Sequence, residues 1–299
     1  MNDFLTGLIV KAISGFYYVS VGDSVYECRA RGTFRKDGSS PLVGDIVDLS
    51  ADISGKGIIE KIHPRKNSLV RPAIANLDKL FIVSSFITPA PNLLIIDRLT
   101  AICHFYSITP VIVFNKCDLG DFSYYRNIYE NSGYTTIVAS AQSGEGIDSL
   151  KKELAGCVSA FTGNSGVGKS SLLNLLFPQL NLQTGEVSDK LGRGRHTTRH
   201  TELFKHSFSG YVADTPGFSS LDTQYLTLEF KETLAECFPD FSEFLYGCRF
   251  TDCAHIGEKG CSVADAVKEG KIQKSRFESY NAIYNELKDL KTWGKLKKR

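Results

Sequence analysis

The chain carries three different patterns of hydrophobic and polar positions. Up to about residue 68, short apolar runs alternate with turn residues such as Asp37-Gly38-Ser39-Ser40-Pro41 and Ser54-Gly55. Short apolar runs bounded in this way predict β-strands. The expected strands cover residues 8–10, 16–19, 25–30, 43–49 and 57–62. Short strands crowded into so small a span are typical of a β-barrel.

From Leu80 onwards, apolar runs alternate with helical stretches. The expected strands are 80–84, 111–114, 136–139, 158–161 and 211–213, and the expected helices are 92–105, 148–154 and 170–177. This alternation predicts a doubly wound α/β sheet. After about residue 225 the chain becomes helical, with helices expected over 228–238, 262–269 and 276–290. The patterns predict three domains, at residues 1–68, 69–224 and 225–299.

Residues 163–170 read Gly-x4-Gly-Lys-Ser between an expected strand and an expected helix. In this phosphate-loop motif, backbone N–H groups surround phosphate oxygens at a helix N-terminus that favours anions. Lys169 would reach the β- and γ-phosphates, and the Ser170 hydroxyl would bind Mg²⁺. The residues expected to contact the phosphates are Gly163, Asn164, Ser165, Gly166, Val167, Gly168, Lys169, Ser170 and Ser171.

A second motif, Asn115-Lys116-Cys117-Asp118, follows an apolar run and therefore stands at the end of a strand, where α/β sheets bind ligands. The Asp118 carboxylate can accept hydrogen bonds from guanine N1–H and from its exocyclic amine, which adenine does not offer together. Asn115 would tie this base box to the phosphate loop, and the Lys116 stem would cover the base. After the next strand, a backbone N–H near Ser140-Ala141 could meet guanine O6.

Asp214-Thr215-Pro216-Gly217 ends another apolar run. Asp214 would hold the Mg²⁺ shell, and the Gly217 N–H would sense the γ-phosphate. Taken alone, this tetrapeptide could be an ordinary turn. Together with the other motifs at strand ends it predicts a GTPase domain. The base box precedes the phosphate loop, which is a cyclic shift of the usual GTPase order.

Three features together resemble the ribosome small-subunit-dependent GTPase A family over essentially the whole chain. They are the permuted order, the segment Gly192-Arg193-Gly194-Arg195-His196-Thr197-Thr198, and the run Cys248–Cys261 followed by Tyr280. The resemblance implies an α/β fold with an N-terminal OB-type (oligonucleotide-binding) barrel, a circularly permuted P-loop GTPase domain and a helical zinc-binding domain. It also implies binding to the small ribosomal subunit and its rRNA, with GTP hydrolysis during late maturation. Arg199 and Lys259 depart from the family's usual Thr and Pro.

Many GTPases carry a Gln directly after Asp-x-x-Gly to orient the attacking water, but this chain has Phe218 there. Either a partner completes the site or another residue acts. His196 is the candidate, since the family's catalytic His falls on this position, and Thr198 of the same loop is the expected second protein ligand of magnesium. The alternative is that His196 packs or contacts RNA.

Cys248, Cys253, His255 and Cys261 follow C-x4-C-x-H-x5-C spacing. Three thiolates and one imidazole make a closed tetrahedral zinc site of the structural kind. The alternative is three reduced thiols and a surface His. Eight cysteines without a secretion signal fit a reducing cytoplasm better than a disulfide scaffold.

The formal net charge is only +2, so any nucleic-acid contact must come from local patches. Basic and aromatic residues of the first domain offer one patch, and the basic tail 291–299 around Trp293 offers another. The first patch comprises Arg29, Arg31, Arg35 and Lys36, with Tyr17, Tyr18 and Phe34. The alternative is an ordinary solvated hairpin. No apolar run approaches the roughly 18 residues of a membrane span, and we expect a cytoplasmic monomer that binds GTP and GDP.

Three functions remain open on these observations. The first is a GTPase that acts on the small ribosomal subunit, and the second is a GTPase with another RNA or protein target. The third is an RNA-binding GTP sensor without turnover, which Phe218 favours. Because Gly217 lies shortly before the C-terminal domain, ordering of this segment could also swing the zinc domain when the nucleotide changes.

Overall fold

A computed structural model of the chain describes residues 4–36, 40–70, 72–87, 89–182, 201–214 and 228–288. It divides into two compact units. The first unit combines Met1–Phe81 with Gly146–Ser219, and the second combines Ile82–Glu145 with Ser220–Arg299. Each unit therefore joins a part of the GTPase domain to one of the flanking regions.

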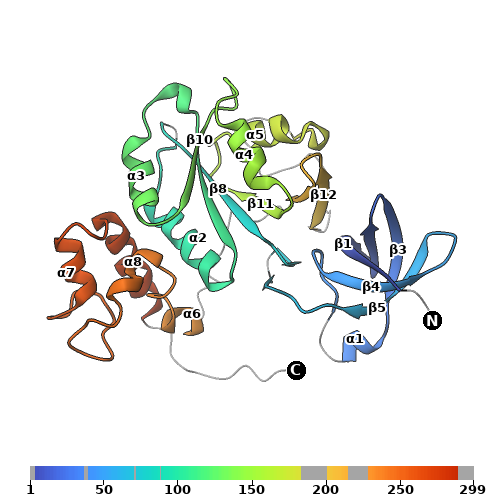
Figure 1. Cartoon of the computed structure of the whole chain (residues 1–299), viewed down its shortest axis with the longest axis horizontal. Helices are drawn as coiled ribbons and strands as arrows, with labels where there is room; N and C mark the ends of the chain where they lie inside the picture. Colours follow the sequence, from blue (N-terminus) through green and yellow to red (C-terminus); the bar gives the residue numbers. More distant parts are fainter. Residues whose placement is uncertain are drawn as a thin grey trace. The chain divides into compact units, whose positions relative to one another are not determined.

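The N-terminal strands of the first unit close into a five-stranded barrel (Figure 1, blue). The strands are β1 (Leu5–Ile13), β2 (Phe16–Val21), β3 (Ser24–Ala30), β4 (Ile46–Ala51) and β5 (Lys56–Ile62), in the order β1-β2-β3-β5-β4 with β4 returning to β1. Their core side chains, among them Ile9, Val19, Leu49 and Ile59, are fully buried. The expected barrel is confirmed, and α1 (Thr33–Lys36) follows β3.

Hydrogen bonds of polar side chains hold the segment after the barrel against residues 44 and 45. It contains the short hairpin β6 (Ser68–Leu69) and β7 (Ile74–Ala75). The Asn76 amide donates to the Gly44 carbonyl at 2.8 Å, and the Arg65 guanidinium binds the buried Asp45 carboxylate at 2.7 Å. Gly44 has φ +91°, and a Cβ there would lie 2.0 Å from the Ala75 carbonyl oxygen, so only glycine fits.

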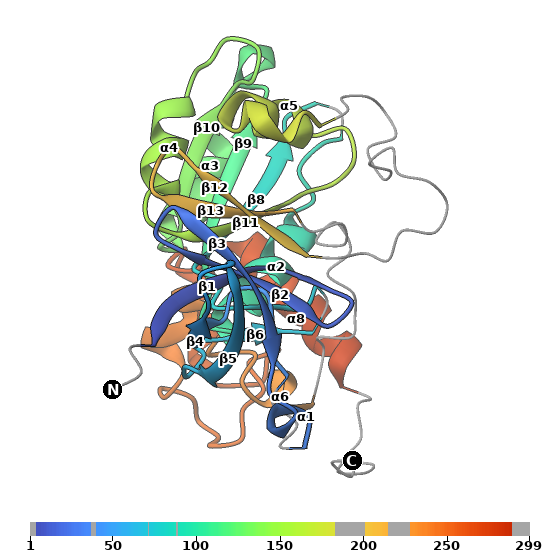
Figure 2. The same ribbon diagram turned by 90° about the vertical axis from the view of Figure 1, so that its right-hand side faces the viewer.

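The barrel sheet continues directly into strands of the expected GTPase domain (Figure 2). Strand β12 (Glu202–His206) pairs with β1 on one side and with β13 (Gly210–Asp214) on the other, and β13 runs parallel to β11 (Val158–Thr162). The Lys11 ammonium pairs with the Glu202 carboxylate at 2.9 Å, and the Ser20 and Tyr211 hydroxyls lie 3.1 Å apart. Helices α4 (Ile147–Leu154) and α5 (Lys169–Leu176) complete this part, followed by η2 (Pro178–Leu180).

The second unit begins within β8 (Lys79–Ser85) and contains a parallel pair, β9 (Thr109–Asn115) and β10 (Thr135–Ala139). Val111 to Phe114 of β9 are all fully buried, as expected of a strand covered on both faces. Helices α2 (Leu93–Phe105) and α3 (Ser123–Asn131) connect these strands, and the short η1 (Cys117–Leu119) follows β9.

The C-terminal part of the second unit is helical, with α6 (Leu228–Glu232), η5 (Pro239–Phe244), α7 (Ser262–Lys268) and α8 (Lys274–Leu287). The helix expected over 228–238 is shorter than predicted. Residues 233–237 form turns in place of a helix, and Phe238 has extended backbone before Pro239 because proline disfavours helical geometry at the residue preceding it. No helix of the described ranges is long and apolar enough to cross a membrane.

Candidate functional site

The base box lies where β9 ends, in the second unit. Asn115 is the last residue of the strand and is buried, and its side-chain oxygen accepts a hydrogen bond from the Ala141 N–H at 3.3 Å. Lys116 adopts a left-handed conformation with φ 68°, which turns the chain sharply into η1. Asn115 therefore connects the box to the Ser140-Ala141 segment, which follows the neighbouring strand β10.

Ser140 fixes the carboxylate that is expected to recognise guanine. Its buried hydroxyl donates to Asp118 Oδ1 at 2.5 Å and accepts from the backbone N–H groups of Gln142 and Ser143 at 3.1 Å each. The loop itself is closed by the Ser140 N–H on the Glu145 carbonyl at 3.0 Å. Asp118 is thus held through one oxygen by a loop that has its own internal hydrogen bonds. The sequence placed Ser140 near the base, but it did not reveal this positioning role.

Cys117 is the third residue of the base box. Its thiol lies 3.4 Å from the Glu145 carboxylate. Burial, together with this hydrogen bond, raises the pKa of Cys117 to about 11. The thiol is therefore neutral near pH 7, and it contributes packing rather than charge to the box.

The phosphate loop lies in the first unit, between β11 and α5, as the sequence predicted. Gly166 and Gly168 both have φ 83°, a left-handed conformation that side-chain-bearing residues rarely adopt. Residues 164–166 are exposed, whereas Val167 is buried and anchors the loop. Lys169 opens α5, and its ammonium lies 3.5 Å from the Gly163 carbonyl oxygen at the start of the loop. Ser170 and Ser171 follow in the first turn and are half-buried.

The Asp-x-x-Gly motif begins where β13 ends, at Asp214, which is paired in register with Glu202 of β12. Other predicted site residues lie outside the described part of the chain. These are His196, Thr198 and Gly217. Because β12 follows residue 201 directly, the two strands β12 and β13 join the segment that bears His196 and Thr198 to the segment that bears Gly217.

The predicted metal ligands come together in the second unit. The ligand atoms of Cys248, Cys253, His255 and Cys261 all lie within 4.8 Å of one another. His255 Nδ1 is 3.4 Å from Cys248 Sγ and 3.7 Å from Cys261 Sγ. Donors around one zinc ion, bound at roughly 2.0–2.3 Å, lie within about 4 Å of one another, so a small inward movement of these four ligand atoms would bring them around a single ion. None of the eight cysteines forms a disulfide.

The surroundings of the cluster also fit a bound cation. Backbone N–H groups of Ser262 and Ala264 point at Cys248 Sγ and Cys261 Sγ, at 3.4 and 3.5 Å, which favours thiolates. Burial raises the pKa of Cys253 to about 12, so this thiol would become a thiolate near pH 7 only beside a positive ion. The Tyr280 hydroxyl donates to the Ala254 carbonyl at 2.6 Å and ties the loop to α8.

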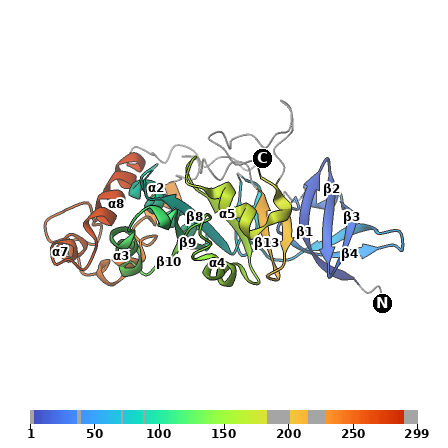
Figure 3. The same ribbon diagram turned by 90° about the horizontal axis from the view of Figure 1, so that it is seen from above.

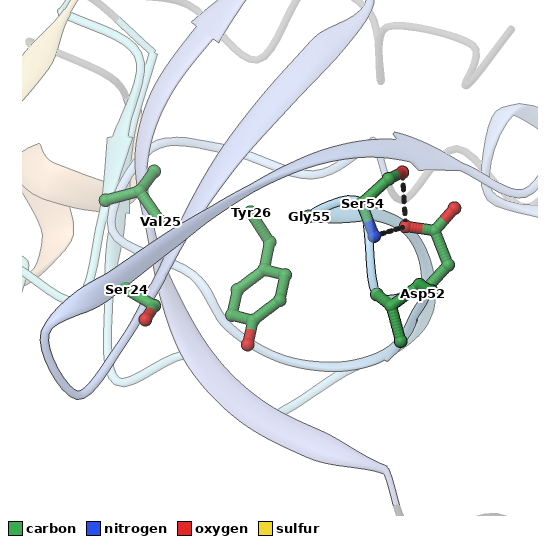
Figure 4. A pocket seen from close by; sticks show the side chains of 7 residues that line it. Ser24, Val25, Tyr26, Asp52, Ser54 and Gly55 are labelled. Carbon is green, nitrogen blue, oxygen red and sulfur yellow. Dashed lines mark hydrogen bonds between the residues drawn. The ribbon is translucent and has the colours of Figure 1, made fainter.

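The barrel carries the basic and aromatic residues named from the sequence. The exposed Arg29 guanidinium lies over the Phe16 ring at 4.7 Å, and Arg31 pairs with Glu60 at 2.5 Å. The side chains of Arg35 and Lys36 lie outside the described residues. A separate shallow pocket lies between the start of β3 and the β4–β5 turn (Figure 4). Asp52 closes that turn by accepting from the Ser54 N–H at 2.8 Å and from the Ser54 hydroxyl at 2.6 Å.

Comparison with known proteins matches nearly the whole chain. The RsgA GTPase family matches residues 62–224, and the RsgA N-terminal domain matches residues 6–59. The small ribosomal subunit biogenesis GTPase RsgA of Bacillus cereus is 45% identical, covering 95% of this chain and 98% of that protein. The protein of the same name from Caldanaerobacter subterraneus is 44% identical, covering 95% and 96%.

Solved structures agree with this assignment. The crystal structure of YloQ, described as a circularly permuted GTPase, has a TM-score of 0.80 and 35% identity, covering 97% of this chain and 96% of that chain. YjeQ from Thermotoga maritima has a TM-score of 0.82 and 34% identity, covering 97% and 100%. The permuted order of base box and phosphate loop, the closed N-terminal barrel and these matches lead to one conclusion: the chain is a circularly permuted GTPase that belongs to the RsgA family.

Proposed function

We propose that this GTPase binds the small ribosomal subunit and hydrolyses GTP during late maturation of that subunit. The observation that carries the nucleotide part is the Asp118 carboxylate, held at 2.5 Å by the buried Ser140 hydroxyl. A carboxylate fixed in this way can accept from guanine N1–H and the exocyclic amine without first reorganising. The ribosomal part rests on the relatives of the same length, which are named small ribosomal subunit biogenesis GTPases.

In this proposal the nucleotide is divided between the two motifs. Asn115, Lys116, Cys117, Asp118 and the Ser140-Ala141 segment hold the guanine, and residues 163–171 hold the phosphates. The Ser170 hydroxyl and Thr198 bind Mg²⁺, Asp214 supports its shell, and the Gly217 N–H meets the γ-phosphate. When bound, magnesium neutralises charge that develops on the phosphates.

His196 is proposed as the residue that orients the attacking water, because Phe218 cannot do so. A group that acts only in the transition state lowers turnover without changing nucleotide affinity. His196→Ala should therefore reduce turnover and leave the GTP dissociation constant unchanged. A parallel loss of affinity would instead assign His196 a structural role.

The metal site is proposed to hold zinc. Three cysteines and one histidine are the donor set of structural zinc sites, and the N–H groups around the sulfurs favour the thiolate form. The ion would complete the fold of the loop between η5 and α7. We also propose that the barrel contacts rRNA, since Arg29 stacked on Phe16 offers a cation and a flat ring together. The proposed setting is a cytoplasmic monomer with domains at 1–68, 69–224 and 225–299.

Co-sedimentation with purified small subunits tests the ribosomal part. Protein loaded with a non-hydrolysable GTP analogue should pellet with small subunits and not with large subunits. It should pellet less with GDP, because a factor that leaves after hydrolysis binds more tightly in its GTP state. Equal recovery with both subunits, at a salt concentration that suppresses non-specific RNA binding, would contradict the proposal.

A second candidate is a GTP sensor that binds RNA without turnover. Phe218 in place of the usual Gln favours it. The membership of the chain in a GTPase family argues against it. Tight GTP binding with no phosphate release, in the presence or absence of small subunits, would favour this second candidate.

A further inference from the structure

A buried arginine joins the metal-binding region to the base-box half of the GTPase domain. Here the base-box half means residues 82–145, and the metal-binding region means residues 228–288; both belong to the second unit. Arg276 lies on α8 and has no exposed surface. Lys and Arg are almost never fully buried unless they are paired, so the partners of this side chain need an explanation.

Arg276 contacts both parts at once. In the base-box half, its Nη1 donates to Asp97 Oδ1 on α2 at 2.7 Å, and its Nη2 donates to the Tyr134 hydroxyl, just before β10, at 3.1 Å. In the metal-binding region, its Nη2 donates to Asp240 Oδ1 at 2.8 Å, and its Nε approaches Asp240 Oδ2 at 3.3 Å. The guanidinium also lies 4.5 Å from the centre of the Phe238 ring.

The side chains of the acidic partners are also buried. The side chains of Asp97 and Asp240 are 1% and 4% exposed. Asp240 is held in addition by the Ser132 hydroxyl at 3.3 Å, again from the base-box half. A charge withdrawn from water in this way is stable only while its partners stay in place. Any rotation of α8 relative to α2 would separate buried opposite charges.

Two further contacts between the base-box half and the metal-binding region involve residues of α2. Arg98 of α2 pairs with Glu286 of α8 at 2.5 Å, and the Phe105 ring packs edge-on against Phe230 of α6, with centroids 5.4 Å apart. Figures 1 and 3 both show α8 beside α2. Contacts with the metal-binding region therefore extend from Asp97 to the last residue of α2. A hinge would require few contacts between the two parts, so this arrangement does not provide one.

We propose that Arg276 is a positioning residue that locks the metal-binding region to the base-box half, so that the two move as one body. The metal-binding region then does not swing separately when the nucleotide changes, and a force applied to it reaches the helix and strands that carry Asn115 and Asp118. This inference goes beyond the proposed function, because it concerns which parts of the chain move together.

Pulsed dipolar EPR on the full-length protein tests this inference. Two spin labels are attached through non-thiol unnatural residues at exposed positions, Asn127 on α3 and Glu269 just after α7. The distance distribution between the labels is recorded without nucleotide, with GDP and with a non-hydrolysable GTP analogue. We expect one narrow distribution with the same mean in all three states. A mean that shifts between states by more than the width of the distribution would overturn the proposal.

Variants of the contact complete the test. Arg276→Gln, which cannot pair with both carboxylates, should lose the narrow peak and give a broad distribution. Glu286→Gln is the matched control, because it removes an ion pair between the same two helices whose partners are 21% and 43% exposed; it should behave as the wild type. If Arg276→Gln does not fold, Asp240→Asn carries the test, since it keeps the side-chain shape and removes one of the two buried carboxylates. A narrow, unchanged distribution in the folded variant would overturn the proposal.

Metal content and GDP affinity are measured on each variant. Both should be retained in Arg276→Gln, because its contacts include neither the metal ligands nor the base box. Failure of the wild type to bind GTP or GDP would contradict the proposed function. In that case, the distance distributions of nucleotide-free wild type and nucleotide-free Arg276→Gln would still test whether Arg276 holds the two parts together.

Discussion

Asp118 is the residue proposed to select guanine. One of its carboxylate oxygens is already bound by the Ser140 hydroxyl, so the direction of the remaining acceptor is fixed by the protein. Fixed acceptors discriminate well, because the wrong base leaves a buried or oriented polar group without its partner. Guanine specificity is therefore expected to depend on a pair of residues rather than on Asp118 alone.

Replacing Asp118 with Asn should weaken GTP binding. The substitution can place an amide donor opposite the exocyclic amine of guanine, which should cost roughly 2–3 kcal/mol. Xanthosine triphosphate carries an oxygen in place of that amine, and its affinity should rise. Isothermal titration calorimetry with both nucleotides measures the change. Equal GTP affinity in the wild type and in Asp118→Asn would remove the base-box assignment.

Ser140→Ala tests the positioning role by itself. Loss of the hydroxyl frees Asp118 and leaves two loop N–H groups without their acceptor, so GTP affinity should fall by about fivefold, or ~1 kcal/mol. Ser143→Ala is the control, because its exposed hydroxyl only accepts from the Glu145 N–H, at 3.3 Å. If the two variants bound GTP equally well, Ser140 would have no influence on Asp118.

The motif residues can be picked out from the sequence, whereas the residues that support them cannot. Gly163 to Ser170 and Asn115 to Asp118 are recognisable because their spacing is fixed by contact with the nucleotide. The bond from Ser140 to Asp118 depends on closure of a loop 22 residues further along the chain. The sequence predicted a helix from Arg276 onwards but no role for this residue, and only the packing of α8 on α2 shows that its side chain is buried.

Strands and helices with strong patterns were also predicted well. Each expected strand of the barrel and of the sheet exists, because continuous apolar runs between turn residues have few alternatives. Strand β12 was missed because Glu202 to His206 mixes charged and apolar residues; its stability comes from pairing with β1 and β13. Helix α3 was missed because only Ile128 and Tyr129 are buried, which leaves a weak periodic signal.

The packing of α8 on α2 should contribute unequally to stability. Breaking a buried ion pair leaves an uncompensated charge and costs about 3–5 kcal/mol, whereas an exposed pair contributes about 0–1 kcal/mol. Arg276→Gln should therefore lower the free energy of unfolding of the second unit far more than Glu286→Gln. Urea unfolding followed by hydrogen exchange of α2 and α8 measures the difference. An equal decrease in the free energy of unfolding in both variants would show that the buried ion pair stabilises the protein no more than the exposed one.

The loop between η5 and α7 is proposed to need a bound metal ion for its fold. We expect purified protein to contain one zinc ion per chain, bound by Cys248, Cys253, His255 and Cys261. Cys253→Ala should lose the ion and loosen this loop, because metal binding and local folding are one event there. GTP affinity should survive, since the phosphate loop and base box rest on separate strands. Cys28→Ala, at a buried barrel thiol, is the control for metal content.

Elemental analysis of protein purified without chelator is the direct measurement. Absence of any bound metal in the wild type would refute the site. A Cys253→Ala protein that kept its zinc would show that this cysteine is not a ligand.

At the scale of the whole molecule, the boundary between the two compact units lies within the GTPase domain and not at its ends. The phosphate loop belongs to the unit that contains the barrel, and the base box belongs to the unit that contains the metal cluster. Circular permutation makes this division possible, because the base box precedes the phosphate loop and the chain returns to the C-terminal helices afterwards.

This division was not visible in the pattern of the sequence. The pattern of apolar runs changes after about residue 68 and again after about residue 225, so the sequence suggests boundaries at those positions. The contacts that define the units come from distant residues, such as Lys11 with Glu202 and Asp97 with Arg276. Pairs so far apart in sequence leave no periodic signal in a single chain.

The rate of GTP hydrolysis with and without purified small ribosomal subunits tests the central claim most directly. With Phe218 after the Asp-x-x-Gly motif, the protein alone should turn over slowly, and small subunits should stimulate it strongly. Lys169→Ala, which removes the charge expected on the β- and γ-phosphates, should be inactive in both conditions. A wild-type rate that small subunits leave unchanged, or that large subunits raise equally, would contradict the account.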